Sequence, residues 1–246
     1  MTNILDSVIS VPCHPKNRGG TRPASAIQYI AFHYTGNDGD TDANNARYYR
    51  DNVVQASAHY FVDDDSITQS VEDLGIAWAV GGKKWADCPQ TGGGVLFLKA
   101  TNYNTISIEL CDTRRDGQIM ATEATLARAA ELGRALMKKY NIPIERVIRH
   151  FDVSGKHCPA YFMDNAAWEA FKARLVEKEE NGMNGMKLYR YVDELPYGKE
   201  AVTRAIQSGH IKRDASGAMG LWEPNLQTVI LMDRAGMFDK PAIPKR

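Results

Sequence analysis

Along the first 180 residues, stretches in which apolar residues recur as in a β-strand are followed by stretches in which they recur as in a helix. This alternation limits the fold more than any other feature of the sequence. Strands are predicted over 27–33 (IQYIAFH), 105–111 and 146–150, and helices over 42–54, 123–140 and 165–177. Elements in this order pack as layers, with helices covering the faces of a sheet. The sequence therefore predicts an α/β domain with a central mixed β-sheet flanked by helices.

Two strand patterns add detail to the predicted sheet. The run SAHYFVDDDSITQSV predicts a hairpin, because two β-rich stretches flank an Asp-Asp-Asp-Ser turn. In the strand over 105–111 the side chains alternate, so Ser107 and Glu109 lie opposite an apolar face. A carboxylate among apolar neighbours costs free energy unless it is solvated or paired. Glu109 is therefore either a functional residue or a strand residue that faces water.

The composition changes near residue 180. The run KEENGMNGMK is charged and rich in Gly and Asn, and it has no periodicity, so it is predicted to be a linker. Two further helices are predicted over 196–208 and 224–235, each opened by a proline and followed by a glycine. We therefore predict two domains, 1–180 and 184–246. The second is a small helical module, more suited to docking or binding than to catalysis.

Composition excludes several classes of partner. Lys plus Arg and Asp plus Glu both number 30, which gives a net charge of zero and argues against a nucleic acid or an anionic membrane as partner. No apolar run reaches the ~18–20 residues that span a bilayer, so no membrane insertion is expected. The start MTNILDSVISVPCHP lacks the basic and apolar regions of a signal peptide. We expect a cytoplasmic protein that reaches the outside only when another agent releases it.

Residues with metal-binding chemistry occur in two separate stretches. His33 ends a predicted strand, and His150 and Cys158 lie seven residues apart in RHFDVSGKHCP. Each one alone has a structural explanation, and the His-Cys spacing by itself is a weak signal. Together, two imidazoles and one thiolate would leave zinc an open fourth position, as catalytic zinc sites do. A carboxylate such as Glu109 could then accept a proton from water, and a lysine could stabilise an oxyanion.

The motifs resemble those of the type 2 N-acetylmuramoyl-L-alanine amidases, a family that includes phage endolysins and the animal peptidoglycan recognition proteins. The resemblance covers about residues 25–178 and rests on five motifs in the family's order: IAFHYTGN, SAHYFVDDDSITQSV, IAWAVG, NTISIELCD and RHFDVSGKHCPAYF. It implies that one zinc ion is bound by three residues, His33, His150 and Cys158.

The resemblance also implies roles for four further residues. Glu109 matches the catalytic carboxylate of the endolysin branch, and Lys156 matches the lysine two residues before the last ligand. His59 matches a histidine of the family's hairpin and Trp78 an aromatic near the groove, so both are expected to bind substrate. 

The chain departs from the family pattern at two positions. Some members have a tyrosine before the hairpin histidine, where this chain has Ala58, and some have a histidine shortly after the Ala-Trp dipeptide, where it has Val80. Tyr60 should point to the opposite strand face from His59, so it is not expected to replace that tyrosine. Both departures leave Glu109 with more of the acid-base work.

Several neighbouring residues have competing interpretations. Adjacent residues of an extended segment point opposite ways, so only one of His157 and Cys158 can face the metal; the resemblance selects the cysteine and leaves His157 exposed or lining the groove. Asp152 is expected to be a turn residue rather than a partner of the ligands. Cys111 is expected to be a buried apolar residue, and Cys13 and Cys88 receive no role.

The resemblance implies a zinc-dependent hydrolase that cuts the amide between N-acetylmuramic acid and L-alanine of the stem peptide, in a phage or prophage endolysin released to the cell wall. The alternatives are a peptidoglycan-binding module without catalysis and a cytoplasmic amidase that recycles muropeptides. The first conflicts with the complete ligand set, and the second would not need an anchoring module. The C-terminal unit is similar to helical tails of such amidases, and we expect it to target the wall or to join two copies as a homodimer.

Overall fold

The computed structural model describes residues 3–115, 117–176, 188–189, 191–214 and 217–239. The chain divides into two compact units, Met1–Lys178 and Glu179–Arg246. Within the described parts, no helix is both long enough and apolar enough to cross a membrane.

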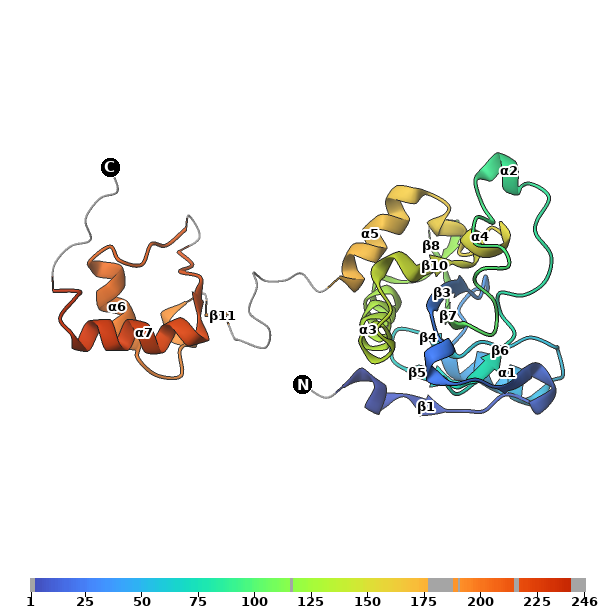
Figure 1. Cartoon of the computed structure of the whole chain (residues 1–246), viewed down its shortest axis with the longest axis horizontal. Helices are drawn as coiled ribbons and strands as arrows, with labels where there is room; N and C mark the ends of the chain where they lie inside the picture. Colours follow the sequence, from blue (N-terminus) through green and yellow to red (C-terminus); the bar gives the residue numbers. More distant parts are fainter. Residues whose placement is uncertain (1–2, 116, 177–187, 190, 215–216, 240–246) are drawn as a thin grey trace. The chain divides into compact units, whose positions relative to one another are not determined.

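A six-stranded sheet forms the centre of the first unit (Figure 1). Its order is β1 (Ile9–Ser10), β5 (Ile67–Gln69), β4 (Tyr60–Val62), β7 (Thr105–Leu110), β3 (Tyr29–Tyr34) and β10 (Val147–Arg149). The β4–β5 pair is the predicted hairpin and is antiparallel, whereas the other neighbours in the sheet are parallel. The mixed sheet with its helices confirms the predicted α/β class.

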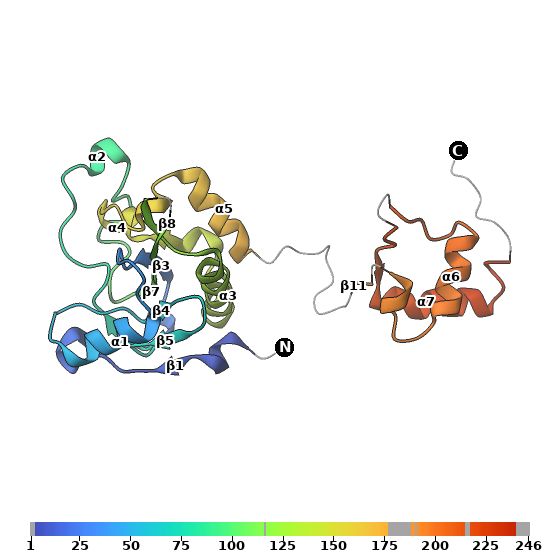
Figure 2. The same cartoon turned by 180° about the vertical axis from the view of Figure 1, so that it is seen from behind.

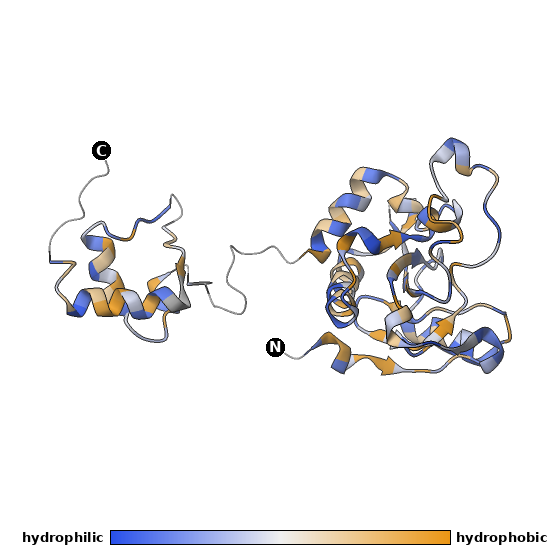
Figure 3. Cartoon of the chain, in the orientation of Figure 1, coloured by the Kyte–Doolittle hydropathy of each residue, from blue (hydrophilic) through white to orange (hydrophobic). Residues whose placement is uncertain are grey.

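Helices cover both faces of this sheet (Figure 2). On one face, α3 (Glu123–Tyr140) and α5 (Asn165–Leu175) bury apolar side chains against the strands, and Phe32 contacts the rings of Trp168 and Phe171. Apolar and polar residues alternate along both helices, as expected when one side of a helix is buried (Figure 3). On the other face, α1 (Asp42–Asp51) packs near β4 and β5, where Tyr49 stacks on Phe61.

Shorter elements complete the first unit. They are η1 (Ile4–Ser7), η2 (Pro15–Asn17), β2 (Arg18–Thr21), η3 (Ala24–Ala26), β6 (Gly75–Ala77), α2 (Cys88–Thr91), β8 (Thr113–Arg115), β9 (Gln118–Met120), η4 (Ile144–Arg146), α4 (His150–Ser154) and η5 (Ala160–Phe162). The N-terminal segment joins the fold through two strand pairings, β1 with β5 and β2 with β6.

The second unit has a core of its own. It comprises β11 (Leu188–Tyr189), η6 (Val192–Glu194), α6 (Lys199–Gln207), β12 (Leu221–Trp222) and α7 (Glu223–Arg234). The apolar sides of the two helices meet, and Tyr189 and Phe238 fill the space beside them. Both helices are followed by glycines with positive φ, Gly209 and Gly236. The two short helices therefore bury part of their apolar surface against each other and against other residues of the same unit.

Candidate active site

Three parallel strands bring the predicted site residues to one edge of the sheet. His33 pairs in register with Glu109 across β3 and β7. Phe32 pairs with Arg149 across β3 and β10, so His150, the next residue, lies beside His33. The carboxyl ends of neighbouring parallel strands share an edge, which is where α/β sheets commonly bind ligands. Residues distant in the sequence thus become neighbours.

The side chains at this edge form a close cluster. His33 Nδ1 lies 3.9 Å from Cys158 Sγ and 3.9 Å from Glu109 Oε1. The His33 and His150 ring centroids are 4.8 Å apart. Nitrogen and sulfur atoms that His33, His150 and Cys158 can offer a metal all lie within 4.8 Å of one another. The structure therefore brings the three predicted ligands and Glu109 together.

The donor atoms of this cluster suit a metal ion. All three predicted ligands are buried, and among the described residues neither His33 Nε2 nor His150 Nδ1 has a hydrogen-bond partner. Buried polar atoms are nearly always paired, so these two imidazole nitrogens in the interior are suited to binding a metal ion. Two imidazoles and one thiol are donors that zinc prefers, and a set of three leaves one position open. His33, His150 and Cys158 thus fit zinc.

Burial also gives the two histidines the protonation state that metal binding needs. It holds the pKa of His33 well below its usual value, with a further decrease from His150 and Lys156. It lowers the pKa of His150 to about 4, helped by the Lys156 ammonium. Both imidazoles are therefore neutral at neutral pH and can offer a lone pair. Burial raises the pKa of the Cys158 thiol to about 12, which favours the protonated thiol. A bound cation would favour the thiolate instead.

Glu109 lies at the margin of the cluster. Its side chain keeps 18% of its exposure, and its Oε2 has no hydrogen-bond partner in the described part of the chain. Burial raises the pKa of Glu109 to about 8, although the Lys156 ammonium lowers it. The Lys156 side chain is exposed beside the cluster. A carboxyl group with a pKa near the working pH can exchange protons with water or substrate.

An arginine that sequence analysis did not identify fixes the start of the segment 150–158, which carries two of the predicted ligands. The Arg149 guanidinium donates to Asp152, to the Phe162 carbonyl and to Asn165 Oδ1. The Asp152 carboxylate also accepts the backbone N–H of Arg149, at 2.8 Å. Asp152 therefore caps the first turn of α4 just after His150, which confirms the turn interpretation. An acidic residue three positions after Arg149 is the signal that could have revealed this pair.

A second segment holds the end of α4. The Trp85 N–H and the Cys88 Sγ both donate to the Ser154 carbonyl, at 2.8 and 3.0 Å. Gly155 follows with φ +79°, and a Cβ on it would lie 1.9 Å from Cys88 Sγ. Cys88 thus has a packing role that the sequence did not indicate.

Two residues of the same segments reach the surface. His157 pairs with Asp87 at 3.0 Å and is 54% exposed, which fits the expectation that it does not bind the metal. Trp85 is 49% exposed, and its backbone N–H donates to the carbonyl of Ser154, four residues before Cys158 in the sequence. Trp85 is therefore a candidate substrate contact that sequence analysis missed.

His59 lies in the interior of the first unit, and its burial contradicts the expectation that it contacts substrate. Its side chain has no exposed surface. Nδ1 accepts the Ser107 N–H at 3.0 Å, while Nε2 lies 2.9 Å from Arg22 Nη2 and 3.2 Å from the Gly75 carbonyl oxygen. Both ring nitrogens are thus engaged, and no atom remains for a ligand.

Two other hairpin-region residues have defined places. Tyr60 points to the opposite face, as expected, and its hydroxyl donates to buried Asp73. Trp78 follows β6, is half-buried and exchanges backbone and hydroxyl hydrogen bonds with Ser57. Substrate contact by Trp78 stays a prediction. Cys111 is buried, as expected.

Comparison with known proteins gives consistent matches. The family model described as N-acetylmuramoyl-L-alanine amidase matches residues 23–161. The amidase XlyB of Bacillus subtilis (strain 168) is 30% identical over 190 residues, which cover 77% of this chain and 51% of XlyB. A probable N-acetylmuramoyl-L-alanine amidase of Bacillus licheniformis is 30% identical over 181 residues, which cover 71% of this chain and 48% of the relative. The chain thus spans about half the length of these curated relatives.

Solved structures match about two thirds of the chain. The catalytic domain of XlyA is 29% identical with a TM-score of 0.53, and the match covers 68% of this chain and 98% of that domain. PlyL is 27% identical with a TM-score of 0.54, over 68% of this chain and 96% of PlyL. A mutant endolysin from Bacillus subtilis is 28% identical with a TM-score of 0.53, over 68% of this chain and 97% of that protein.

Proposed function

The chain belongs to the N-acetylmuramoyl-L-alanine amidase family, as its motifs predicted, and we propose that it is a zinc-dependent peptidoglycan hydrolase. The bond cut is the amide between N-acetylmuramic acid and L-alanine of the stem peptide. The observation that carries this proposal is the buried cluster of His33, His150 and Cys158 beside Glu109. All four residues lie within the matched range 23–161.

Each residue of the cluster has one part in the proposed reaction. His33, His150 and Cys158 hold the metal, and a bound zinc ion supplies Lewis acidity that makes water a better nucleophile near neutral pH. Glu109 accepts the proton of the attacking water as a general base and returns it to the leaving amine of L-alanine. Its position beside His33 and its partial exposure allow it to meet both.

Lys156 stabilises negative charge in the same reaction. Its ammonium lies close enough to lower the pKa values of His33, His150 and Glu109. A fixed positive charge at this place favours the oxyanion that develops on the scissile carbonyl. Lys156 also keeps part of the Glu109 population ionised, so that a base is available.

The biological setting is proposed from the relatives. An endolysin from Bacillus subtilis is among the similar structures, which supports a phage or prophage endolysin that acts on the wall after release from the cytoplasm. The second unit would target the wall or join two copies of the chain. A muropeptide-recycling amidase is the second candidate function. This function predicts that the chain is equally active with and without its second unit.

A metal measurement tests the ligand set. Cys158→Ser should lose both zinc, measured by elemental analysis, and the release of new L-alanine amino termini from sacculi. The matched control is Cys13→Ser, a buried cysteine in a different apolar cluster that does not include the predicted ligands. Full zinc occupancy and normal turnover in Cys158→Ser would contradict the assignment.

A second variant separates catalysis from binding. Glu109→Ala should keep its zinc and sediment with sacculi, yet hydrolyse them on the order of 10²–10⁴-fold more slowly. Glu131→Ala, which removes an exposed carboxylate from α3, is the control and should act at the wild-type rate. Wild-type turnover in Glu109→Ala would leave Glu109 as a polar strand residue. Zinc-loaded wild-type protein that binds sacculi without cutting them would support a binding module instead.

A further inference from the structure

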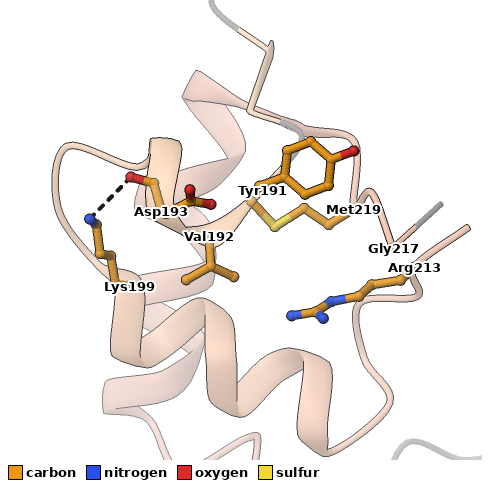
Figure 4. Close-up of a pocket in the computed structure, with 7 residues that line it drawn as sticks. All are labelled: Tyr191, Val192, Asp193, Lys199, Arg213, Gly217 and Met219. Atoms are coloured by element: carbon orange, nitrogen blue, oxygen red, sulfur yellow. Dashed lines mark hydrogen bonds between the residues drawn. The ribbon is translucent and has the colours of Figure 1, made fainter.

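The second unit contains a hollow of about 410 Å³ (Figure 4). It lies between η6, the start of α6 and the segment before β12, and it is lined by Tyr191, Val192, Asp193, Lys199, Arg213, Gly217 and Met219. Its volume is in the range of sites that take a small molecule or one unit of a polymer. None of these residues belongs to the metal cluster of the first unit.

One side of the hollow is apolar. Tyr191 and Met219 lie side by side, with Val192 below them in the view of Figure 4. Tyr191 is 43% exposed, its neighbour Val192 packs against the apolar core of the unit, and Met219 is part of that core. Aromatic rings that combine an apolar face with a polar edge commonly contact ligands at such places. This side offers a flat apolar surface against which the less polar face of a ligand's ring can pack.

The other side carries polar groups that can form further hydrogen bonds. The Arg213 side chain extends beneath Met219 in Figure 4, and among the described residues its guanidinium has neither a hydrogen-bond nor an ion-pair partner. Lys199 donates one N–H to the Asp193 carbonyl, at 3.1 Å, which leaves two for another acceptor. The Asp193 carboxylate can accept hydrogen bonds from hydroxyl groups. Two cations against one carboxylate favour an anion with hydroxyl groups around it.

We propose that this hollow binds an acidic saccharide unit of the bacterial cell wall, with its ring against Tyr191 and its carboxylate or phosphate on Arg213. Guanidinium groups bind both anions through paired hydrogen bonds. The inference rests on the proposed action on peptidoglycan and assigns a site to its wall-targeting unit. A second copy of the chain fits less well, because stable protein interfaces bury ~1,200–2,000 Å² of surface rather than filling a hollow of this size.

Matched variants of the full-length chain test this site. Arg213→Gln and Tyr191→Ala each remove one side of the hollow. Lys212→Gln and Tyr197→Ala remove an exposed cation and an exposed ring outside it, and they serve as controls. Affinity for purified sacculi is measured by co-sedimentation in a Glu109→Ala background, so that the wall is not digested. Cleavage of soluble muropeptides is measured in the otherwise wild-type background, and circular dichroism checks folding.

The proposal expects both hollow variants to bind sacculi at least about 10-fold more weakly, the loss of one charged hydrogen bond or one ring contact. Both controls should bind as the parent does, and all four should cleave soluble muropeptides normally. Sacculi stripped of phosphate-containing polymers then distinguish the two sources: lost binding indicates a wall phosphate, and retained binding a peptidoglycan carboxylate.

Two results would overturn the site. One is parental binding by both Arg213→Gln and Tyr191→Ala, and the other is an equal loss in the controls. Failure of the amidase proposal would look different, because soluble muropeptides would stay uncut by the wild-type chain while the hollow variants still lost affinity for sacculi.

Discussion

His33 and His59 show how little a residue type reveals without its partners. Both are buried histidines that lie in or next to strands of the same sheet. His59 has neighbours at both ring nitrogens, whereas His33 Nε2 has no partner in the described residues. The sequence cannot show this difference, because Arg22, which reaches His59, lies 37 positions away. The resemblance identified His33 correctly as part of the cluster, but it could not show that His59 is internal.

The buried place of His59 predicts a role in stability. Replacing it with Gln should lower the free energy of unfolding by about 1–3 kcal/mol, because the Ser107 N–H and the Gly75 carbonyl lose a well-placed partner. Thermal unfolding followed by circular dichroism measures this change, and KM for soluble muropeptides should not move. A raised KM at unchanged stability would restore the substrate-binding interpretation.

The same residue predicts a dependence on pH. Burial and the nearby Arg22 lower the pKa of His59 to about 3, whereas in the unfolded chain it is near the usual ~6.5. Between these values the unfolded state binds a proton that the folded state refuses. The stability that neutral His59 contributes is therefore complete above about pH 6.5 and is lost as the pH falls toward 3. Metal-free protein should show a smaller loss over this window in His59→Gln than in the wild type.

Lys156 gives a catalytic prediction at the same scale. Lys156→Ala should retain zinc but lower kcat by roughly 10²–10³-fold, the effect of removing one oxyanion donor. KM should change little, because the charge acts mainly on the transition state. Lys99→Ala, at an exposed position of the same unit, is the control. Loss of zinc in Lys156→Ala would instead give the residue a structural role.

Among the elements, those long enough to repeat a periodic pattern several times could be predicted from the sequence. The helix over 123–140 has the observed bounds of α3, because eighteen residues repeat an apolar side and Thr122 caps the first turn. The hairpin of β4 and β5 follows from its turn. Short elements could not be predicted: β1 has two residues and α4 has five, too few to show a period. They exist because partners such as β5 and Arg149 hold them.

The end of α4 supports a prediction about packing between elements. In Gly155→Ala the new Cβ meets Cys88 Sγ, and the positive φ adds strain of about 1 kcal/mol. The loop with Lys156 and Cys158 should shift, so that zinc affinity and activity fall together. Cys88→Ala in the same chain removes the sulfur and should recover most of the loss. Zinc titration of the two single variants and the double variant measures this coupling; additive losses would show that Cys88 does not set the fit.

For the whole molecule, the division into two units is the feature that function must explain. The composition change near residue 180 indicated a boundary, and the chain divides into its two compact units between Lys178 and Glu179. The cluster of His33, His150 and Cys158 lies entirely in the first unit, so the proposed chemistry does not need residues of the second. The sequence could not show the hollow of the second unit, because Tyr191 and Arg213 come together only when the segment before β12 folds back on η6.

A chain that ends at Lys178 tests what the second unit adds. It should bind zinc and hydrolyse small soluble muropeptides at the wild-type rate, because every residue of the cluster is present. On intact sacculi it should be slower, since a tethered wall-binding unit raises the local concentration of the catalytic unit, by 10-fold or more when the two sites can be engaged together. Rates on both substrates, with the mass in solution measured by light scattering, give the comparison. Equal rates on sacculi, with both the full-length and the shortened chain monomeric, would exclude both wall targeting and dimer formation. A dimeric full-length chain, with a monomeric and slower shortened chain, would favour the dimer over the saccharide site.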